Sequence, residues 1–146
     1  MKPLSKAVAA GAIGAVTTNV LHEIVRRVTR EAPRVDLLGM QALAHLLKAV
    51  GTDVPDHGTL YGVTLAGDLV SNSGYFALLG TAPGDRKLAA GAVLGLAAGL
   101  GAVYLPGPLG LSTQPTDRGV ATRAITVALY GAGGVVAGAA YRALPA

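Results

Sequence analysis

Four stretches of the chain are almost free of charged residues, and short polar segments separate them. They run from Ala7 to Leu21, from Thr59 to Thr81, from Leu88 to Leu111 and from Ala124 to Tyr141. A helix of a water-soluble bundle needs a charged stripe on its outer face, and these stretches have none. With their flanks, they approach the roughly 20 residues that a helix needs to cross a bilayer. The pattern predicts an all-α integral membrane protein built as a bundle of four transmembrane helices.

We expect one transmembrane domain over residues 1–146, with spans at about 4–25, 59–80, 88–105 and 119–143. Between the first two spans, residues 36–50 carry an amphipathic pattern that is too short to cross. This segment predicts an additional helix on the membrane surface or against the bundle. Asp36 is its expected N-cap, and Gly51 is its expected terminator.

Glycines recur at helical spacing in the last two predicted spans. Gly91, Gly95 and Gly99 repeat every four residues, and Gly134 and Gly138 show the same spacing. Because glycine has no side chain, such a face lets another helix approach to backbone contact. We therefore expect close helix packing here, including assembly into an oligomer through the glycine faces.

The second predicted span carries an aspartate near its middle. Thr64, Asp68 and Asn72 follow each other at steps of four residues and share a helix face. A carboxylate at mid-membrane costs roughly 2.5–3.5 kcal/mol on insertion scales, so it normally faces protein or water. Asp68 with Asn72 is thus a candidate site for a proton, an ion or a small polar solute. The alternative is a structural role, in which Asp68 pairs with Arg123 or His22 or is hydrogen-bonded to neighbouring helices.

Four crossings would place both long connections on the same side of the membrane, which we call the loop side. His22, Thr64 and Arg123 would then lie in the same half of the bilayer, with Asp68 deeper. Tyr130 lies seven residues after Arg123 and shares its helix face. The expected site is a polar cluster between the first, second and fourth spans. Both termini would lie on the opposite side, which the density of basic residues there marks as cytoplasmic.

A second group of charges has the spacing of ordinary helix ion pairs. Glu23 lies three residues before Arg26 and four before Arg27. We expect structural ion pairs among these residues. His22 is adjacent to Glu23 and points about 100° away from it, so the two do not converge on one ligand.

Composition strengthens the membrane interpretation and disfavours several function classes. Of the residues, 51% are hydrophobic and only 14% are charged, and the mean hydropathy is +0.51. The net charge of +4 comes from basic residues beside the apolar stretches, which favours lipid headgroups over nucleic acid. The sequence has no cysteine, and its three histidines lack ligand spacing. We therefore expect neither a metal site nor a cofactor.

No nucleophile or acid–base constellation is recognisable, so a membrane enzyme is the weakest of three hypotheses and the sequence favours a non-enzymatic function. The first hypothesis is a protein that binds or transports a proton, ion or small polar solute at the polar cluster. The second is a non-catalytic structural or assembly subunit of a larger membrane complex. In either case we expect contact with the lipid bilayer and association with further copies or other membrane subunits.

Overall fold

The computed structural model describes residues 1–145, and no strand occurs in that range. Its helices are α1 (Pro3–Val28), α2 (Val35–Ala49), α3 (His57–Ala77), α4 (Lys87–Tyr104) and α5 (Val120–Ala143). Two short 3-10 turns, η1 (Leu78–Thr81) and η2 (Gly84–Arg86), connect α3 to α4. The expected all-α class and the additional helix between the first two long helices are confirmed.

Three segments within residues 1–145 are long and apolar enough to cross a membrane: α1, α5 and Gly84–Tyr104, which contains α4. The helix α3, which we also expected to span, is not among them. Its polar side chains explain the difference, because Asp68, Ser71, Asn72 and Ser73 fall within six residues and lower its hydropathy. The membrane prediction is therefore supported for three helices of the expected four.

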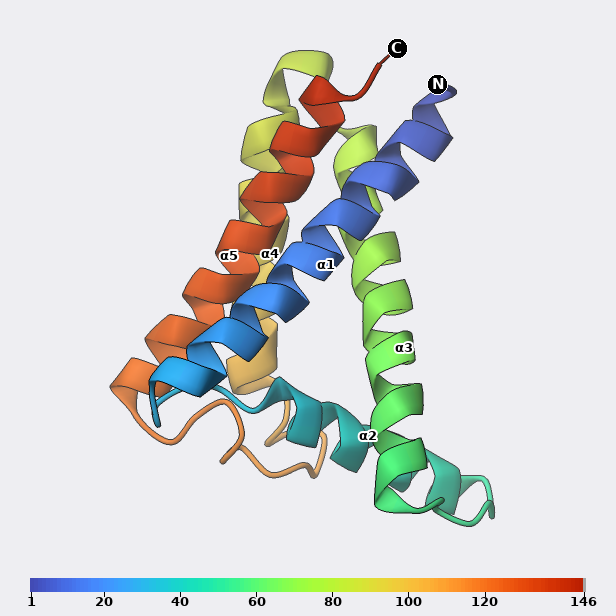
Figure 1. Ribbon diagram of the computed structural model, residues 1–146, viewed down its shortest axis with the longest axis vertical. Coiled ribbons are helices and arrows are strands. Elements are labelled where there is room, and N and C mark those ends of the chain that lie inside the picture. Colours follow the sequence, from blue (N-terminus) through green and yellow to red (C-terminus); the bar gives the residue numbers. More distant parts are fainter. Residues whose placement is uncertain (146) are drawn as a thin grey trace.

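The long helices form an open bundle whose two ends differ. Figure 1 shows α4 and α5 side by side, with α1 crossing in front of α5 and reaching α3. The helix α3 packs mainly on α1 and α2 and has few contacts with α4 and α5. Both termini lie at one end of the molecule, and the two long connections lie at the other (Figure 1). This second end is the loop side.

Backbone contact between glycines holds α4 against α5. A Cβ atom on Gly91 would fall on the carbonyl oxygen of Gly134, and one on Gly95 would fall on that of Tyr130. No residue with a side chain fits there, which is the expected role of small residues between helices. The same seam contains the remaining expected packing glycines, Gly99 and Gly138. These faces are occupied within the chain, so the expectation that they assemble an oligomer is wrong.

Small residues on α1 also bring it close to both of its neighbours. A Cβ atom on Gly11 would lie 2.8 Å from the backbone nitrogen of Ala77 in α3. On another face of α1, a Cβ atom on Gly14 would lie 2.6 Å from the Cβ of Ala137 in α5. The side chains buried at these junctions form a cluster that we call the terminal core, made of Ala15, Phe76, Leu79 and Ala137.

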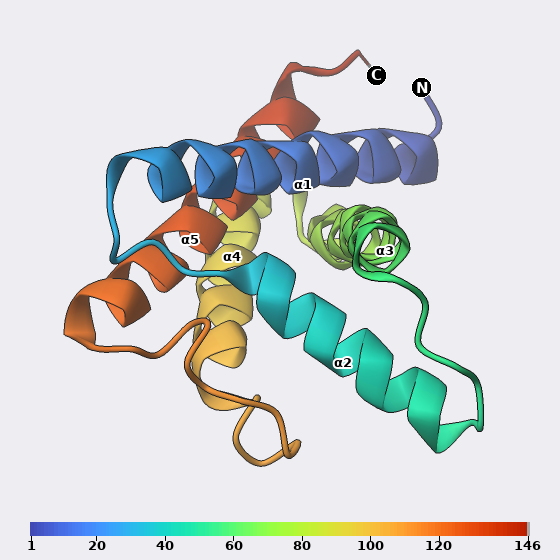
Figure 2. The ribbon, with the colours of Figure 1, turned by 60° about the horizontal axis from the view of Figure 1, so that its bottom comes forward.

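The helix α2 lies across the loop side, between the end of α1 and the start of α3 (Figure 2). It is tied to the α4–α5 connection, because the backbone nitrogen of Arg34 donates to the Pro115 carbonyl over 2.7 Å. Gly51 follows α2 with a φ of +72°, as expected for a terminator. Asp36, however, is not the N-cap. Arg34 occupies that position, and Asp36 accepts hydrogen bonds from its guanidinium instead.

Candidate binding site

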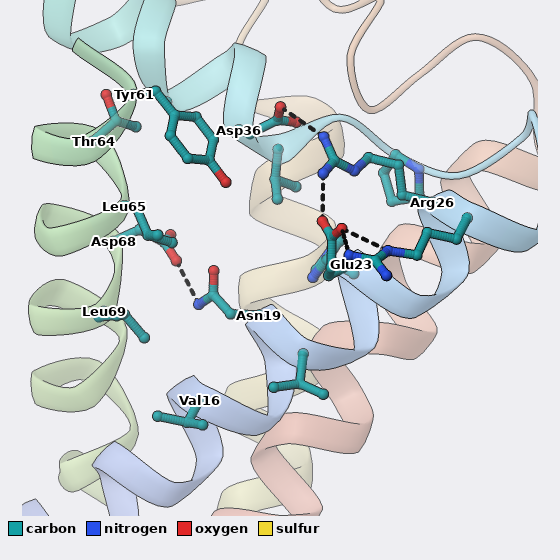
Figure 3. A pocket seen from close by; sticks show the side chains of 16 residues that line it. Val16, Asn19, Glu23, Arg26, Asp36, Tyr61, Thr64, Leu65, Asp68 and Leu69 are labelled. Atoms are coloured by element: carbon teal, nitrogen blue, oxygen red, sulfur yellow. Dashed lines mark hydrogen bonds and ion pairs between the residues drawn. The ribbon is translucent and has the colours of Figure 1, made fainter. Parts of the chain in front are cut away.

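A pocket of about 460 Å³ opens between α1, α2 and α3 on the loop side. Its volume is within the range of about 300–1,000 Å³ that is usual for small-molecule sites. Figure 3 shows the residues that line it, with Asn19 and Val16 on α1 facing Asp68 and Leu69 on α3. The pocket thus lies where the two helices separate toward the loop side.

The carboxylate of Asp68 bridges α3 and α1 through two amide side chains. Asn19 Nδ2 donates to Asp68 Oδ2 over 2.8 Å, and Asn72 Nδ2 donates to Asp68 Oδ1 over 2.8 Å. Asn19 Nδ2 also lies 3.1 Å from the carbonyl oxygen of Ala15, which orients the amide toward α3. A carboxylate offers about four acceptor positions. Asp68 therefore retains acceptor capacity after both amide bonds are made.

Asp68 pairs with neither of the two cations that the structural alternative names. Arg123 Nε lies 3.2 Å from Asp117 Oδ1, and Arg123 borders a separate groove between α4 and α5. Among residues 1–145, the ion pairs within 4.0 Å involve Glu23, Asp36 and Asp117, but not Asp68. The Asp68–Arg123 pair of the structural alternative is wrong, because Arg123 pairs with a carboxylate six residues away in the preceding connection. The other form of that alternative, a hydrogen bond to a neighbouring helix, agrees with the contact from Asn19 of α1.

His22 lines the pocket and is only 7% exposed. Its Nδ1 lies 2.9 Å from the carbonyl oxygen of Thr18. Because a carbonyl only accepts, a neutral His22 carries its proton on Nδ1 and offers Nε2 as an acceptor. This Nε2 is buried and has no hydrogen-bond partner in the described chain. The ring packs edge-on against Tyr130 of α5, with centroids 5.3 Å apart, so Tyr130 supports His22 and does not line the pocket.

Thr64 lines the same pocket from α3, and its hydroxyl is also buried without a partner in residues 1–145. The absence of a side chain at Gly39 lets α2 lie against α3 here, since a Cβ atom on Gly39 would be 2.7 Å from Thr64 Cγ2. The third wall of the pocket is consequently α2. The expected cluster between the first, second and fourth spans is corrected in this respect, because α5 contributes no lining residue.

The charged residues at the mouth of the pocket neutralise one another. Glu23 accepts hydrogen bonds from Arg26 and Arg27, the latter over 2.9 Å from Nε. Arg26 Nη1 also lies 3.6 Å from Asp36 Oδ2 and so connects α1 to α2. Partial burial acts to raise the pKa of Asp36, but the hydrogen bonds and charge of Arg34 outweigh it and hold that pKa below its usual value. Asp36 is therefore ionised at neutral pH.

Away from the loop side, the pocket is closed. Beyond Asp68, α1 and α3 converge until Gly11 touches the α3 backbone. Phe76 and Leu79 of the terminal core are completely buried at this end. The pocket accordingly communicates with the loop side and not with the end that carries the termini.

Sequence reasoning did not assign Asn19 or Gly39 to the site, although both line the pocket. Asn19 lies three residues before His22, an expected site residue, but this spacing does not show which neighbouring helix its amide faces. Gly39 carries no recognisable signal, since its role depends on where α2 meets α3.

Comparison of the chain with protein-family models, with curated proteins and with solved structures gave no match. The chemistry of the pocket is therefore the guide to function.

Proposed function

We propose that this chain is a small multi-pass membrane protein that binds, and in the fuller hypothesis transports, a proton, ion or small polar solute at Asp68. One observation carries the proposal. A carboxylate with free acceptor capacity and no cationic partner borders a pocket of about 460 Å³. An uncompensated charge between helices is costly, and such groups usually mark an ion or solute site.

The outer surface of the bundle supports its placement in a bilayer. Large apolar side chains on α1 and α4 are half or more exposed, among them Ile24, Val93 and Tyr104. Lipid chains would cover these side chains, whereas in water they would form exposed apolar patches. The helix α3 fits the same placement as a fourth crossing, because Asp68 accepts hydrogen bonds from Asn72 and from Asn19 of α1.

This placement implies an orientation for the pocket. Both termini lie at one end of the bundle (Figure 1), and we propose that this end faces the cytoplasm. The pocket would then open on the opposite side of the membrane. A solute would reach Asp68 by passing the paired charges of Glu23, Arg26 and Asp36 at the mouth.

Reconstitution into liposomes tests this function. Wild-type protein and the Asp68→Asn variant would be compared for passage of protons, sodium and a panel of small polar solutes. Asp85→Asn is the matched control, because Asp85 lies in the exposed η2 turn. We expect wild type and the control to show a saturable flux or binding that Asp68→Asn abolishes while the protein stays folded. Equal behaviour of all three proteins toward every probe would refute the proposal.

A structural or assembly subunit remains the second candidate, and one observation favours it. The outward face of α3 has open space at Gly67 and Gly74, and Val70 on the same helix is 73% exposed. If this is the function, Asp68→Asn should lower assembly or yield. Mass spectrometry after purification in mild detergent would show retained membrane subunits, and a co-purifying large complex would overturn the autonomous function.

A further inference from the structure

We propose that the pocket binds an organic ammonium ion, meaning a protonated primary amine attached to a compact apolar group. This inference rests on the proposed function, because it names the ligand class of the same pocket. It follows from three properties of the lining: the hydrogen-bonding sense of its polar atoms, its unpaired charge, and its apolar walls.

The polar groups left without a protein partner are matched to a hydrogen-bond donor. His22 Nε2 accepts, because Nδ1 is engaged with the Thr18 carbonyl over 2.9 Å. Asp68 accepts one amide bond on each oxygen and has positions left for further donors. The Thr64 hydroxyl, also without a partner, can accept as well. A primary ammonium group carries three donors and no acceptor, so it complements this set.

The charge of the pocket selects a cation over an anion. Both arginines on its wall, Arg26 and Arg27, already pair with Glu23, and Arg26 also approaches Asp36. Asp68 is the lining carboxylate that forms no ion pair in residues 1–145. A bound ammonium would supply the missing countercharge, and a charge-assisted hydrogen bond to a carboxylate is among the stronger kinds.

The remaining walls are apolar and call for an organic body on the cation. Val16 of α1 faces the pocket together with Leu65 and Leu69 of α3 (Figure 3). Val20 of α1 also lines it. These side chains offer no ligands to a metal ion. A pocket of about 460 Å³ also exceeds what one bare ion requires.

A hard metal cation fits this lining less well. Calcium takes six to eight oxygen ligands and magnesium six, normally with more than one carboxylate or several waters. Within residues 1–145, no three His, Cys, Asp or Glu side chains form a group that could hold a metal ion. The arrangement therefore favours an ammonium over a divalent metal.

Two sources could supply the ammonium group. It could belong to a free amine that enters from the loop side, or to the ethanolamine headgroup of a phospholipid in the adjoining leaflet. Both present the same three donors to the acceptor groups of the pocket. A lipid source would make bilayer composition change the affinity for a free amine.

Titration calorimetry on the detergent-purified protein at pH 7.5 tests the proposal with four probes of similar size or charge. The probes are benzylammonium, neutral benzyl alcohol, anionic benzoate and sodium chloride. We expect benzylammonium to bind at least roughly tenfold more tightly than the alcohol, with no binding of benzoate, because only the cation can pair with Asp68. Asp68→Asn should weaken benzylammonium binding about tenfold, while Asp85→Asn should leave it unchanged.

Thr64→Val provides a second variant that does not depend on the fate of Asp68→Asn. It removes the hydroxyl while keeping the shape, and we expect benzylammonium binding to fall about threefold. If benzyl alcohol or benzoate binds as tightly as benzylammonium, the ammonium inference is overturned.

The failure of this inference can be separated from failure of the proposed function. Asp68-dependent flux of another solute, without benzylammonium binding, would sink the ammonium ligand and leave the solute-binding function standing. If neither Asp68-dependent flux nor benzylammonium binding is observed, both the ammonium ligand and the solute-binding function are refuted. In nanodiscs, a benzylammonium affinity that falls as phosphatidylethanolamine replaces phosphatidylcholine would identify the lipid headgroup as the source. An affinity independent of that replacement would identify a free amine.

Discussion

His22 and Thr64 each bury a polar atom that no group in the described chain satisfies. Such groups are uncommon in folded proteins because burial without a hydrogen bond costs about 1–3 kcal/mol. Both residues line one pocket, beside a carboxylate with spare acceptor capacity. At the scale of single residues, the protein thus gives up stability at the position where a ligand would restore it.

Replacing Thr64 by Val should stabilise the empty protein. The substitution removes a buried hydroxyl that has no partner and keeps the side-chain volume. We expect the free energy of unfolding to rise by about 1 kcal/mol, measured by thermal or chemical denaturation in detergent. Thr126→Val is the control, because the Thr126 hydroxyl is buried and donates to the Thr122 carbonyl over 2.7 Å. This control should lose about 1 kcal/mol. A loss of stability in Thr64→Val would show that its hydroxyl is already satisfied.

The contact between Arg34 and Asp36 should give the protein a pH-dependent stability. The pKa of Asp36 lies below its ordinary value of 3.8 in the folded chain. The stabilising contribution is therefore complete above about pH 4 and disappears as the pH falls through the lower folded pKa. We expect wild type to melt at a higher temperature than Asp36→Asn at pH 7, with the difference shrinking below about pH 4. A difference that stays constant down to about pH 2 would contradict this assignment.

At the scale of helices, the protein has two kinds of interface, which differ in how closely the two backbones approach. The α4–α5 seam is formed by glycines in backbone contact, whereas α3 meets α1 partly through polar bonds such as Asn19–Asp68. The first kind is rigid because a packed seam has no room for added atoms. The second kind leaves space at the loop side, where the pocket lies.

Adding one methyl group should have opposite effects on stability in the α4–α5 seam and on the outward face of α3. In Gly134→Ala, the new Cβ would fall on the Gly91 carbonyl, so we expect a loss of roughly 1–3 kcal/mol in the free energy of unfolding. In Gly74→Ala, the new Cβ would meet nothing within 4 Å. Because alanine favours helix over glycine by about 1 kcal/mol, this variant should be equal to wild type or more stable. Denaturation of both variants in the same detergent measures the contrast, and equal loss in the two would refute the seam.

The helices could be predicted from the sequence, but their partners could not. Apolar stretches and helical spacing placed Asn72 beside Asp68, and the structure shows a hydrogen bond between them. Asn19 escaped because its contact with Asp68 depends on how α1 rotates against α3. Arg123 was assigned to Asp68 although Asp117, six residues earlier, was the nearer carboxylate along the chain. The nearer carboxylate decided the contact of Arg123, and the rotation of α1 decided the contact of Asn19. The spacing of residues along the chain predicts neither.

At the scale of the whole molecule, both termini lie at one end and both long connections at the other (Figure 1). This arrangement predicts the sidedness of thiol labelling in sealed vesicles. The sequence has no cysteine, so single cysteines can be introduced at Ser5, Arg142, Asp53 and Thr113. We expect the first two to react from one side of the membrane and the last two from the other. Labelling of positions 5 and 113 from the same side would contradict a bundle that spans the bilayer.

If the pocket binds a solute, the terminal core determines by which route that solute can leave. It seals one exit from Asp68 with packed side chains and with the contact of Gly11 on the α3 backbone. A protein that only binds its ligand needs no second opening, because the ligand can enter and leave at the loop side. A carrier would need an alternating-access cycle, in which α3 tilts on α1 to unseal this end while the loop side shuts. A cross-link that holds α1 against α3 at this end would therefore arrest a carrier and spare a protein that only binds its ligand.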